Sequence, residues 1–260
     1  MKLTFLGTSA AWPSAKHNNV CFVAHNGDDA VLFECGPSIL HQLAVAGVEP
    51  TAIRSVIVSH IHADHSLGIP SFLVANLIAR RQRPVTICLP ESAIQPMRTI
   101  CLTVHPFMGG FIDATVEWQP LSQAEEGILQ LPGGVHATTA LAEHGIPTVS
   151  THAFFEQDNA ELAFSGDTAY CERVARNASG TSLLIHESNW SVALKTQTGL
   201  GHSTAQDAGR VAALAQAKRL ALVHTDRTIV DYPKQLAAEA GAEFTSGEVL
   251  VPADFTTIDV

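Results

Sequence analysis

Short runs of β-branched and aliphatic residues alternate along the chain with stretches that are typical of helices. The first three runs, residues 3–6, 20–24 and 30–33, predict strands, and the turn-forming residues 26–28 join the second run to the third. Alternating strands and helices are typical of layered proteins that combine both elements. The pattern therefore predicts an α/β architecture.

Capping residues and glycines mark the ends of the predicted helices. A helix that begins near Ser38 is expected to stop at Gly47. Thr204, with Asp207 three residues later, forms a capping-box pattern ahead of a second helix. Because no linker-like or low-complexity segment divides the chain, we predict a single domain over residues 1–260. The predicted helices cover residues 38–47, 208–217 and 234–240, the last of them ending before Gly241.

Side chains that can bind metals or transfer protons follow four of the apolar runs. In layered α/β folds such groups collect at strand ends, because the strand fixes the position while the loop exposes the side chain. Four ends of this kind indicate one shared site. The runs and the residues that follow them are 56–58 before His60, 162–164 before Asp167, 183–185 before His186 and Glu187, and 220–223 before His224.

The densest group is an HxHxDH cluster of His60, His62, Asp64 and His65. His60 and His62 are two residues apart, so in an extended segment their side chains leave on the same face and can bind one ion. Asp64 and His65 follow where the chain turns, and they can serve a second ion. Uncompensated imidazoles and carboxylates have no packing value, so the cluster predicts a metal site.

Two ions need more ligands than this cluster offers, so donors must return to it from elsewhere. His144, Asp167 and His224 are the candidates, and Asp167 is predicted to bridge both ions. His136 competes with His144, but the Gly-Ile-Pro segment after His144 favours His144. Imidazole and carboxylate ligands suit Zn²⁺ and also tolerate Mn²⁺ or Fe. The predicted sets are His60, His62 and His144 for one ion, and Asp64, His65 and His224 for the other.

Composition and charge narrow the choice of partners. The chain is 46% apolar and 15% charged, which is typical of a globular protein with a sizeable core. A formal net charge of −10 repels polyanions, so it argues against nucleic acid and favours a small or neutral substrate. The five cysteines lack CxxC spacing, which fits a reducing cytoplasm. No segment stays apolar for the roughly 20 residues that a membrane helix needs.

The order of HxHxDH, isolated His, Asp and His resembles that of the metallo-β-lactamase superfamily, and most closely its ribonuclease Z branch. Segments 3–8, 32–36, 183–187 and 201–205 also resemble that branch, so the likeness spans most of the chain. The resemblance implies a four-layered αββα sandwich with the metal site at one edge of two sheets. It implies that Glu187 and His202 manage proton transfer. Catalytic candidates are therefore Asp64, Glu187 and His202, although His202 could instead stabilise the start of the helix beside it.

The chain departs from the ribonuclease Z pattern in three places. That branch carries a long arm that grips transfer RNA between the isolated His and the bridging Asp, whereas 22 residues separate His144 from Asp167 here. Glu34 stands where the branch usually has Asp, and residues 225–227 match its usual segment only in part. The missing arm and the acidic balance argue against transfer-RNA processing.

These features predict a dinuclear zinc hydrolase that uses a metal-bound hydroxide on a small phosphodiester or nucleotide-like substrate. A lactonase, thioesterase or other carboxylic-ester hydrolase is the alternative. A transfer-RNA 3′-processing endoribonuclease and a di-iron oxidoreductase are less favoured, the latter because no flavin domain is visible. The sequence leaves a homodimer open.

The sequence leaves the roles of Arg227 and of residues 106–111 open, and it assigns His186 a supporting role. Arg227 is either an anion clamp near the metals or a surface charge. Residues 106–111 form either a mobile flap over the substrate or a turn capped by core aromatics. His186 is interpreted as orienting a ligand or a loop rather than as a ligand itself.

Overall fold

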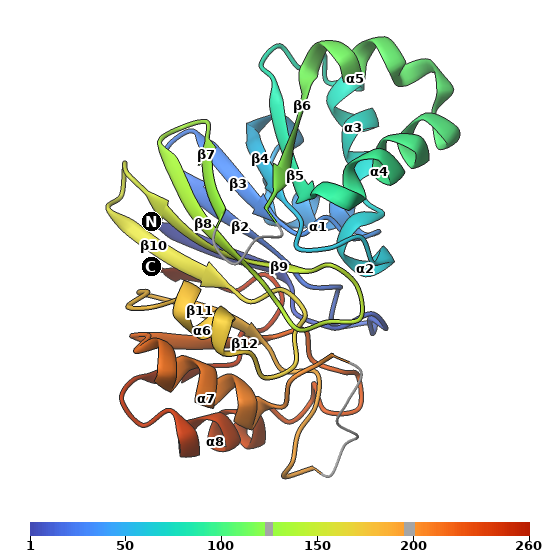
Figure 1. The fold of residues 1–260 in the computed structure, drawn as a ribbon. Helices are drawn as coiled ribbons and strands as arrows, with labels where there is room; N and C mark the ends of the chain where they lie inside the picture. Colours follow the sequence, from blue (N-terminus) through green and yellow to red (C-terminus); the bar gives the residue numbers. More distant parts are fainter. Residues whose placement is uncertain (123–126, 195–200) are drawn as a thin grey trace.

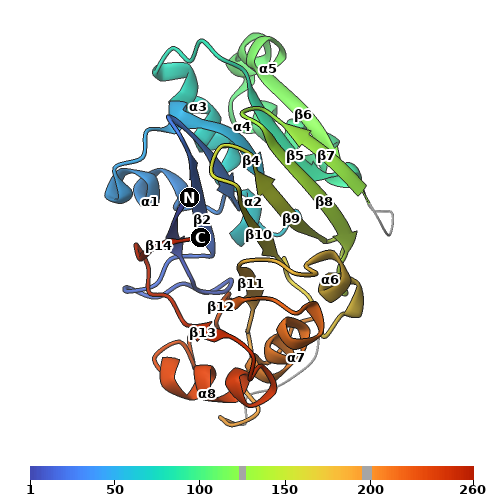
Figure 2. The same cartoon turned by 90° about the vertical axis from the view of Figure 1, so that its left-hand side faces the viewer.

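The structure, a computed structural model, describes residues 1–122, 127–194 and 201–260. Its strands form two mixed sheets, shown in Figures 1 and 2. The described strands of the first sheet are, in spatial order, β14 (Thr257–Asp259), β1 (Lys2–Gly7), β2 (Cys21–Asn26), β3 (Asp29–Phe33), β4 (Ile53–Ile57), β5 (Val85–Pro90) and β6 (Val116–Leu121). Those of the second are β13 (Glu248–Leu250), β12 (Arg219–Val223), β11 (Leu184–Glu187), β10 (Ala160–Phe164), β9 (Val149–Phe155), β8 (Val135–Leu141) and β7 (Gly127–Leu131).

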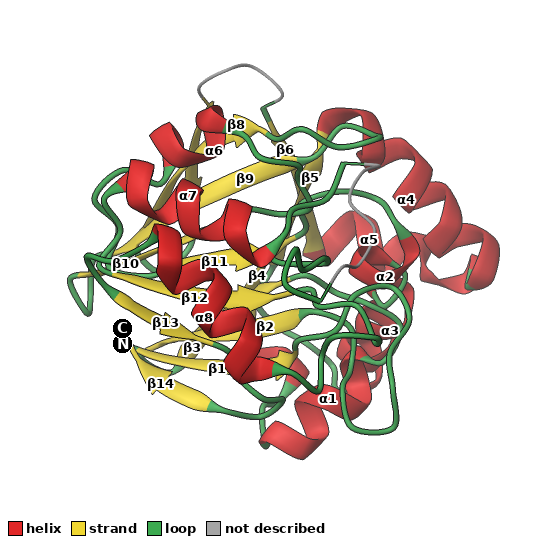
Figure 3. Cartoon of the chain, turned by 90° about the horizontal axis from the view of Figure 1, so that it is seen from below, coloured by secondary structure: helices red, strands yellow, loops and turns green. Residues whose placement is uncertain are grey.

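Helices cover the outer face of each sheet, as the view from below in Figure 3 shows. Among the described residues, none of the helices is both long enough and apolar enough to cross a membrane. The helices on the first sheet are α1 (Ile39–Ala46), α2 (Ala63–Ser66), α3 (Ile69–Ile78), α4 (Glu91–Val104) and α5 (Gly109–Thr115), with 3-10 turns η1 (Pro50–Ala52) and η2 (Pro106–Met108). Those on the second sheet are α6 (Glu172–Asn177), α7 (Ala205–Ala215) and α8 (Pro233–Glu243).

Three separate apolar clusters account for the layers. One lies between the sheets and joins residues such as Phe22 and Phe33 to Phe164, whose ring meets that of Phe22 edge-on at 5.1 Å. The second joins the first sheet to α1, α3 and α4, and the third joins the second sheet to α6, α7 and α8. The central strands are therefore covered on both faces and are apolar runs, whereas β7 and β8 at one edge of the second sheet alternate between buried and exposed residues. The predicted αββα sandwich is confirmed.

The predicted strands and helices are present, but the ends of two helices differ, since α7 covers Ala205–Ala215 where residues 208–217 were predicted. The three early strands and the Thr204–Asp207 capping box are present, whereas Ser38 occupies its N-cap position without a side-chain capping bond. The prediction that the last helix ends before Gly241 is wrong, because α8 continues to Glu243. Leu236 and Ala240 of α8 are buried in the same cluster as α7, and this packing extends the helix past a glycine that favours an end.

Residues 106–111 are helical. They form η2 and the start of α5, and Met108 is buried in the cluster beneath the first sheet. Figures 1 and 2 place α5 beside β6, at the end of the molecule away from α2. This position does not support the interpretation of the segment as a flap over the metal-site residues.

Candidate metal centre

The site forms where strand ends from both sheets meet. β10, β11 and β12 are parallel neighbours, so their carboxyl ends share one edge of the second sheet. At that edge Val149 N donates to Ser59 O over 3.0 Å, which links the second sheet to the end of β4 in the first. Gly166 has a φ of +62°, and a Cβ there would lie 2.9 Å from Cβ of Ser59. A residue without a side chain is therefore required for the two strand ends to approach this closely.

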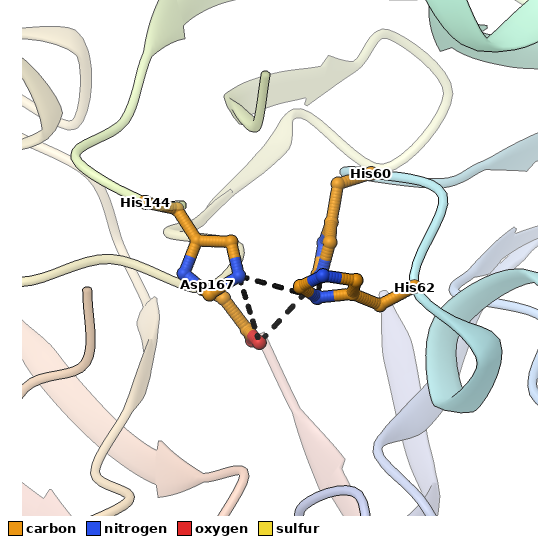
Figure 4. A group of neighbouring side chains, drawn as sticks. All are labelled: His60, His62, His144 and Asp167. Atoms are coloured by element: carbon orange, nitrogen blue, oxygen red, sulfur yellow. Dashed lines mark hydrogen bonds and ion pairs between the residues drawn. The ribbon is translucent and has the colours of Figure 1, made fainter. Parts of the chain in front are cut away.

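Three histidines point their ring nitrogens at one another (Figure 4). His60 Nε2 lies 2.9 Å from His62 Nδ1, and His144 Nε2 lies 3.2 Å from the same atom. His60 follows β4, whereas His144 comes from the loop between β8 and β9. Donor nitrogens that converge from separate segments on one point are typical of a metal site, because imidazoles gain little from meeting one another in this way.

A second group lies beside the first. His65 Nε2 is 3.1 Å from Asp64 Oδ2 and 3.3 Å from His224 Nε2, and His224 Nε2 is 3.4 Å from Asp64 Oδ2. Asp64 and His65 belong to the short helix α2, while His224 follows β12. The structure thus places His144 and His224, each remote in sequence, beside the ligands with which the sequence analysis grouped them.

Asp167 lies between the two groups. Its Oδ2 atom is 3.4 Å from Nε2 of both His65 and His224, and 3.7 Å from His60 Nε2. Its Oδ1 atom is buried with no hydrogen-bond partner among the described residues. Ligands 2.0–2.2 Å from a tetrahedral ion lie roughly 3.3–3.6 Å apart, so these separations fit divalent cations.

The charges of the cluster favour cation binding. Burial opposes ionisation of Asp167, but the neighbouring His224 and His65 hold its pKa well below the usual range. Burial lowers the pKa of His60, so this imidazole is neutral, as a metal ligand must be. Burial also opposes protonation of His65, but Asp167 and Glu34 outweigh it and raise its pKa. The negative field that favours a proton on His65 equally favours a metal ion beside it.

Hydrogen bonds at the far ring nitrogens orient two of the histidines, His60 and His144. Ser59 Oγ lies 2.9 Å from His60 Nδ1, and Gly201 O lies 2.8 Å from His144 Nδ1. A carbonyl oxygen only accepts, so Nδ1 of His144 carries the proton and its Nε2 is left with a lone pair directed into the cluster.

Glu34 is a site residue whose role the sequence analysis did not assign. Its buried carboxylate accepts a hydrogen bond from Ser59 N over 3.1 Å and lies 3.5 Å from His65 Nδ1, so it orients that ring. Glu34 has a φ of +63° and His224 a φ of +52°, which are strained values for residues other than glycine. The sequence pattern that marks His60, Asp167 and His224 also marks Glu34, because Glu34 directly follows the apolar run 30–33.

The half-buried His202 and the buried Glu187 form a pair next to the cluster. His202 Nδ1 donates to Glu187 Oε1 over 2.8 Å, and the same carboxylate accepts from Thr168 N at 2.8 Å and from Asn189 N at 3.1 Å. Burial opposes protonation of His202, but the hydrogen bond and charge of Glu187 outweigh it and raise the pKa of the imidazole. The His202 side chain is 17% exposed, so it faces a space that a ligand can enter.

That space is a cavity of about 460 Å³ lined by Trp12, Asp64, Asp167, His202 and His224 among others. Its size is typical of a site for a small molecule.

Two further residues keep the interpretations made from the sequence, and the structure adds their contacts. Arg227 stacks on Trp12, with Cζ 3.4 Å from the ring centre. His186 is buried, and its Nδ1 donates to the backbone oxygen of Glu187 over 2.7 Å, so it contacts a strand end rather than a ligand side chain.

The other histidines lie outside the cluster. His136 on β8 pairs with Glu156 at 2.7 Å, so the structure brings His144 and not His136 to the centre. None of the candidate metal groups found among the described residues includes His17, His25, His41, His105, His136 or His152.

The sequence and the fold of this chain resemble those of known proteins. The chain is 30% identical over 264 aligned positions to ribonuclease Z of Methanothermobacter thermautotrophicus, with 86% of each chain covered. It is 28% identical over 306 positions to ribonuclease BN of Cronobacter sakazakii, with 100% of both covered, so part of that relative has no counterpart in these 260 residues. The crystal structure of the metallo-β-lactamase fold protein YhfI of Bacillus subtilis matches with a TM-score of 0.83 at 22% identity, covering 99% of this chain and 98% of that one.

Fold, site and relatives define a metal-dependent hydrolase of the metallo-β-lactamase superfamily that acts on ester bonds, in the ribonuclease Z branch. Residues 1–240 match the family model described as "Anti-Pycsar protein Apyc1". The chain belongs to that family.

Proposed function

We propose that this protein is a dinuclear zinc phosphodiesterase that acts on a small phosphodiester or nucleotide-like substrate. The observation that carries the proposal is the position of Asp167 Oδ2, within 4.0 Å of ring nitrogens in both histidine groups. A carboxylate in that position would help to hold two cations. His60, His62 and His144 would hold one ion, and Asp64, His65 and His224 the other.

When bound, the two cations would supply Lewis acidity and stabilise negative charge that develops on the reacting group. The chain's own residues supply the remaining steps. The hydrogen bond and charge of Glu187 raise the pKa of His202 and so favour its protonated form, and because Nδ1 donates to that carboxylate, Nε2 is the atom that can give a proton to the leaving oxygen. Backbone donors on Thr168 and Asn189 hold Glu187 in place, so the direction of His202 does not depend on solvent.

A proton donor distinguishes among the ester hydrolases that use this fold. An alkoxide is a poor leaving group and gains greatly from protonation, whereas a thiolate leaves readily without it. The His202–Glu187 pair therefore favours a phosphodiester over a thioester as substrate. The interval of 22 residues between His144 and Asp167 and the net charge of −10 favour a small substrate over structured RNA.

A hydrolysis screen tests the proposal. The zinc-loaded protein would be offered phosphodiesters, lactones and thioesters, with the Asp167→Ala variant as the control for contaminating activity. We expect phosphodiesters to be hydrolysed with the highest kcat/KM, by the parent protein only. Preferred hydrolysis of a lactone or thioester would assign the protein to the carboxylic-ester hydrolases instead.

A further inference from the structure

Trp12 is an exposed indole at the mouth of the cavity. Its side chain is 62% exposed, and it lines the same cavity as Asp64, His202 and His224. Its place in the lining of this cavity sets Trp12 apart from a single exposed surface residue, because a ligand in the cavity would contact the indole. The proposed mechanism makes no use of this side chain.

The loop that carries Trp12 is fixed to the strand end that carries His224. Ala10 N donates to Thr225 O over 3.1 Å, and Thr225 N donates to Thr8 O over 3.1 Å. These two bonds join the segment before Trp12 to the residue after His224. The indole is therefore exposed but held at a defined position relative to the metal centre, as a binding surface requires.

Arg227 covers one face of the indole. The guanidinium carbon lies 3.4 Å from the ring centre, a cation–π contact between two exposed side chains. The contact restrains rotation of the indole and occupies one of its two faces. With the side chain still 62% exposed, indole surface remains on which a flat ligand could stack.

We propose that Trp12 is the stacking platform for the nucleobase of the substrate, with Arg227 bracing the indole from the opposite face. This inference rests on the proposed function, because it places the phosphodiester at the metal centre and the base at the mouth of the cavity. Stacking on an aromatic ring tolerates different bases, since every base has a π-face. Trp12 therefore selects nucleotides over simple phosphodiesters without choosing strongly among bases.

Two chromogenic substrates with the same leaving group test the platform. They are the p-nitrophenyl ester of thymidine 5′-monophosphate and methyl p-nitrophenyl phosphate, which lacks a nucleoside. In Trp12→Ala the ratio of kcat/KM between the two should fall by about 5- to 150-fold, mainly through KM of the nucleotide ester. Trp12→Phe should retain most of the selectivity. Phe107 is 70% exposed on η2, and Phe107→Ala is the matched control, for which the ratio should not change.

A binding measurement separates this inference from the proposed function. Thymidine 5′-monophosphate should quench part of the tryptophan fluorescence of the zinc-loaded protein, and inorganic phosphate should not. That part should be absent in Trp12→Phe, which keeps Trp118 and Trp190. An unchanged substrate ratio in Trp12→Ala, or equal quenching in Trp12→Phe, would overturn the platform. If the parent protein hydrolyses neither ester, the proposed function fails and the fluorescence result alone decides the role of Trp12.

Discussion

Nδ1 of His202 donates a 2.8 Å hydrogen bond to Oε1 of the fully buried Glu187. The Glu187 carboxylate is shielded from solvent, and it also accepts hydrogen bonds from the backbone N–H groups of Thr168 and Asn189. Its charge therefore acts mainly on the imidazole. Many enzymes use a carboxylate to orient a histidine that accepts a proton. In the proposed reaction His202 instead donates a proton, and Glu187 stabilises its protonated form.

Replacing Glu187 by Gln should move the pH dependence of the reaction. The pKa of His202 is raised in the folded protein, because the hydrogen bond and charge of Glu187 outweigh burial. A proton donor is active below its pKa, so activity should fall as pH rises through the raised value. Glu187→Gln keeps the shape but removes the charge, so the alkaline limb of kcat/KM against pH should shift to lower pH. An alkaline limb at the same pH in both proteins would show that His202 does not set it.

The metal content should be close to two ions per chain. Asp167 contacts both histidine groups, so Asp167→Ala should lower the occupancy of both ions, whereas His144→Ala should lower mainly one. Elemental analysis after zinc repletion and gel filtration measures this, and His136→Ala serves as the control because His136 pairs with Glu156 outside the cluster. Full occupancy in Asp167→Ala would remove the bridging role.

Much of this centre could be predicted because its signals are local. The spacing of His60, His62, Asp64 and His65 and the strand ends before Asp167 and His224 are visible in sequence. The stacking of Arg227 on Trp12 was not predicted, since the two residues are more than 200 positions apart and their contact depends on a bridge between loops. The end of α8 was misplaced for a related reason, because packing against α7 outweighs the local preference of Gly241.

A pair of glycine substitutions should test the packing of α7 on α8. A Cβ at Gly209 in α7 would lie 2.3 Å from the backbone oxygen of Ala240 in α8, so the helices would have to separate. Gly209→Ala should lower the free energy of unfolding by about 1–3 kcal/mol. A Cβ at Gly241 meets nothing within 4 Å, so Gly241→Ala should raise it by about 0.5–1 kcal/mol. Urea unfolding at fixed zinc concentration measures both, and effects of the same sign would contradict the helix packing.

The substrate should be smaller than structured RNA, although two relatives with similar sequences are named ribonuclease Z and ribonuclease BN. The short interval between His144 and Asp167 leaves no room for a gripping arm, and the net charge of −10 offers no general attraction to a phosphate backbone. We expect the purified protein to cleave precursor transfer RNA far more slowly than a small phosphodiester at equal zinc concentration. Cleavage of the RNA with the higher kcat/KM would reverse this assignment.

His202→Ala should affect substrates according to their leaving groups. Loss of a proton donor typically costs 10²–10⁴-fold, so hydrolysis of an alkyl phosphodiester should fall within about that range. A nitrophenyl phosphodiester should lose much less, because nitrophenolate is stable as an anion without protonation.

His202→Ala should also keep both metals, and elemental analysis must accompany the kinetics. His202, Asp167 and His224 also lie close enough together to hold an ion. Loss of an ion from the His202→Ala variant would therefore identify His202 as a metal ligand. A loss of zinc together with equal rate losses on the two substrates would therefore contradict the proton-donor role. Retained zinc with a selective loss on the alkyl ester would leave proton transfer as the explanation, because the two substrates differ only in how much their leaving groups need a proton.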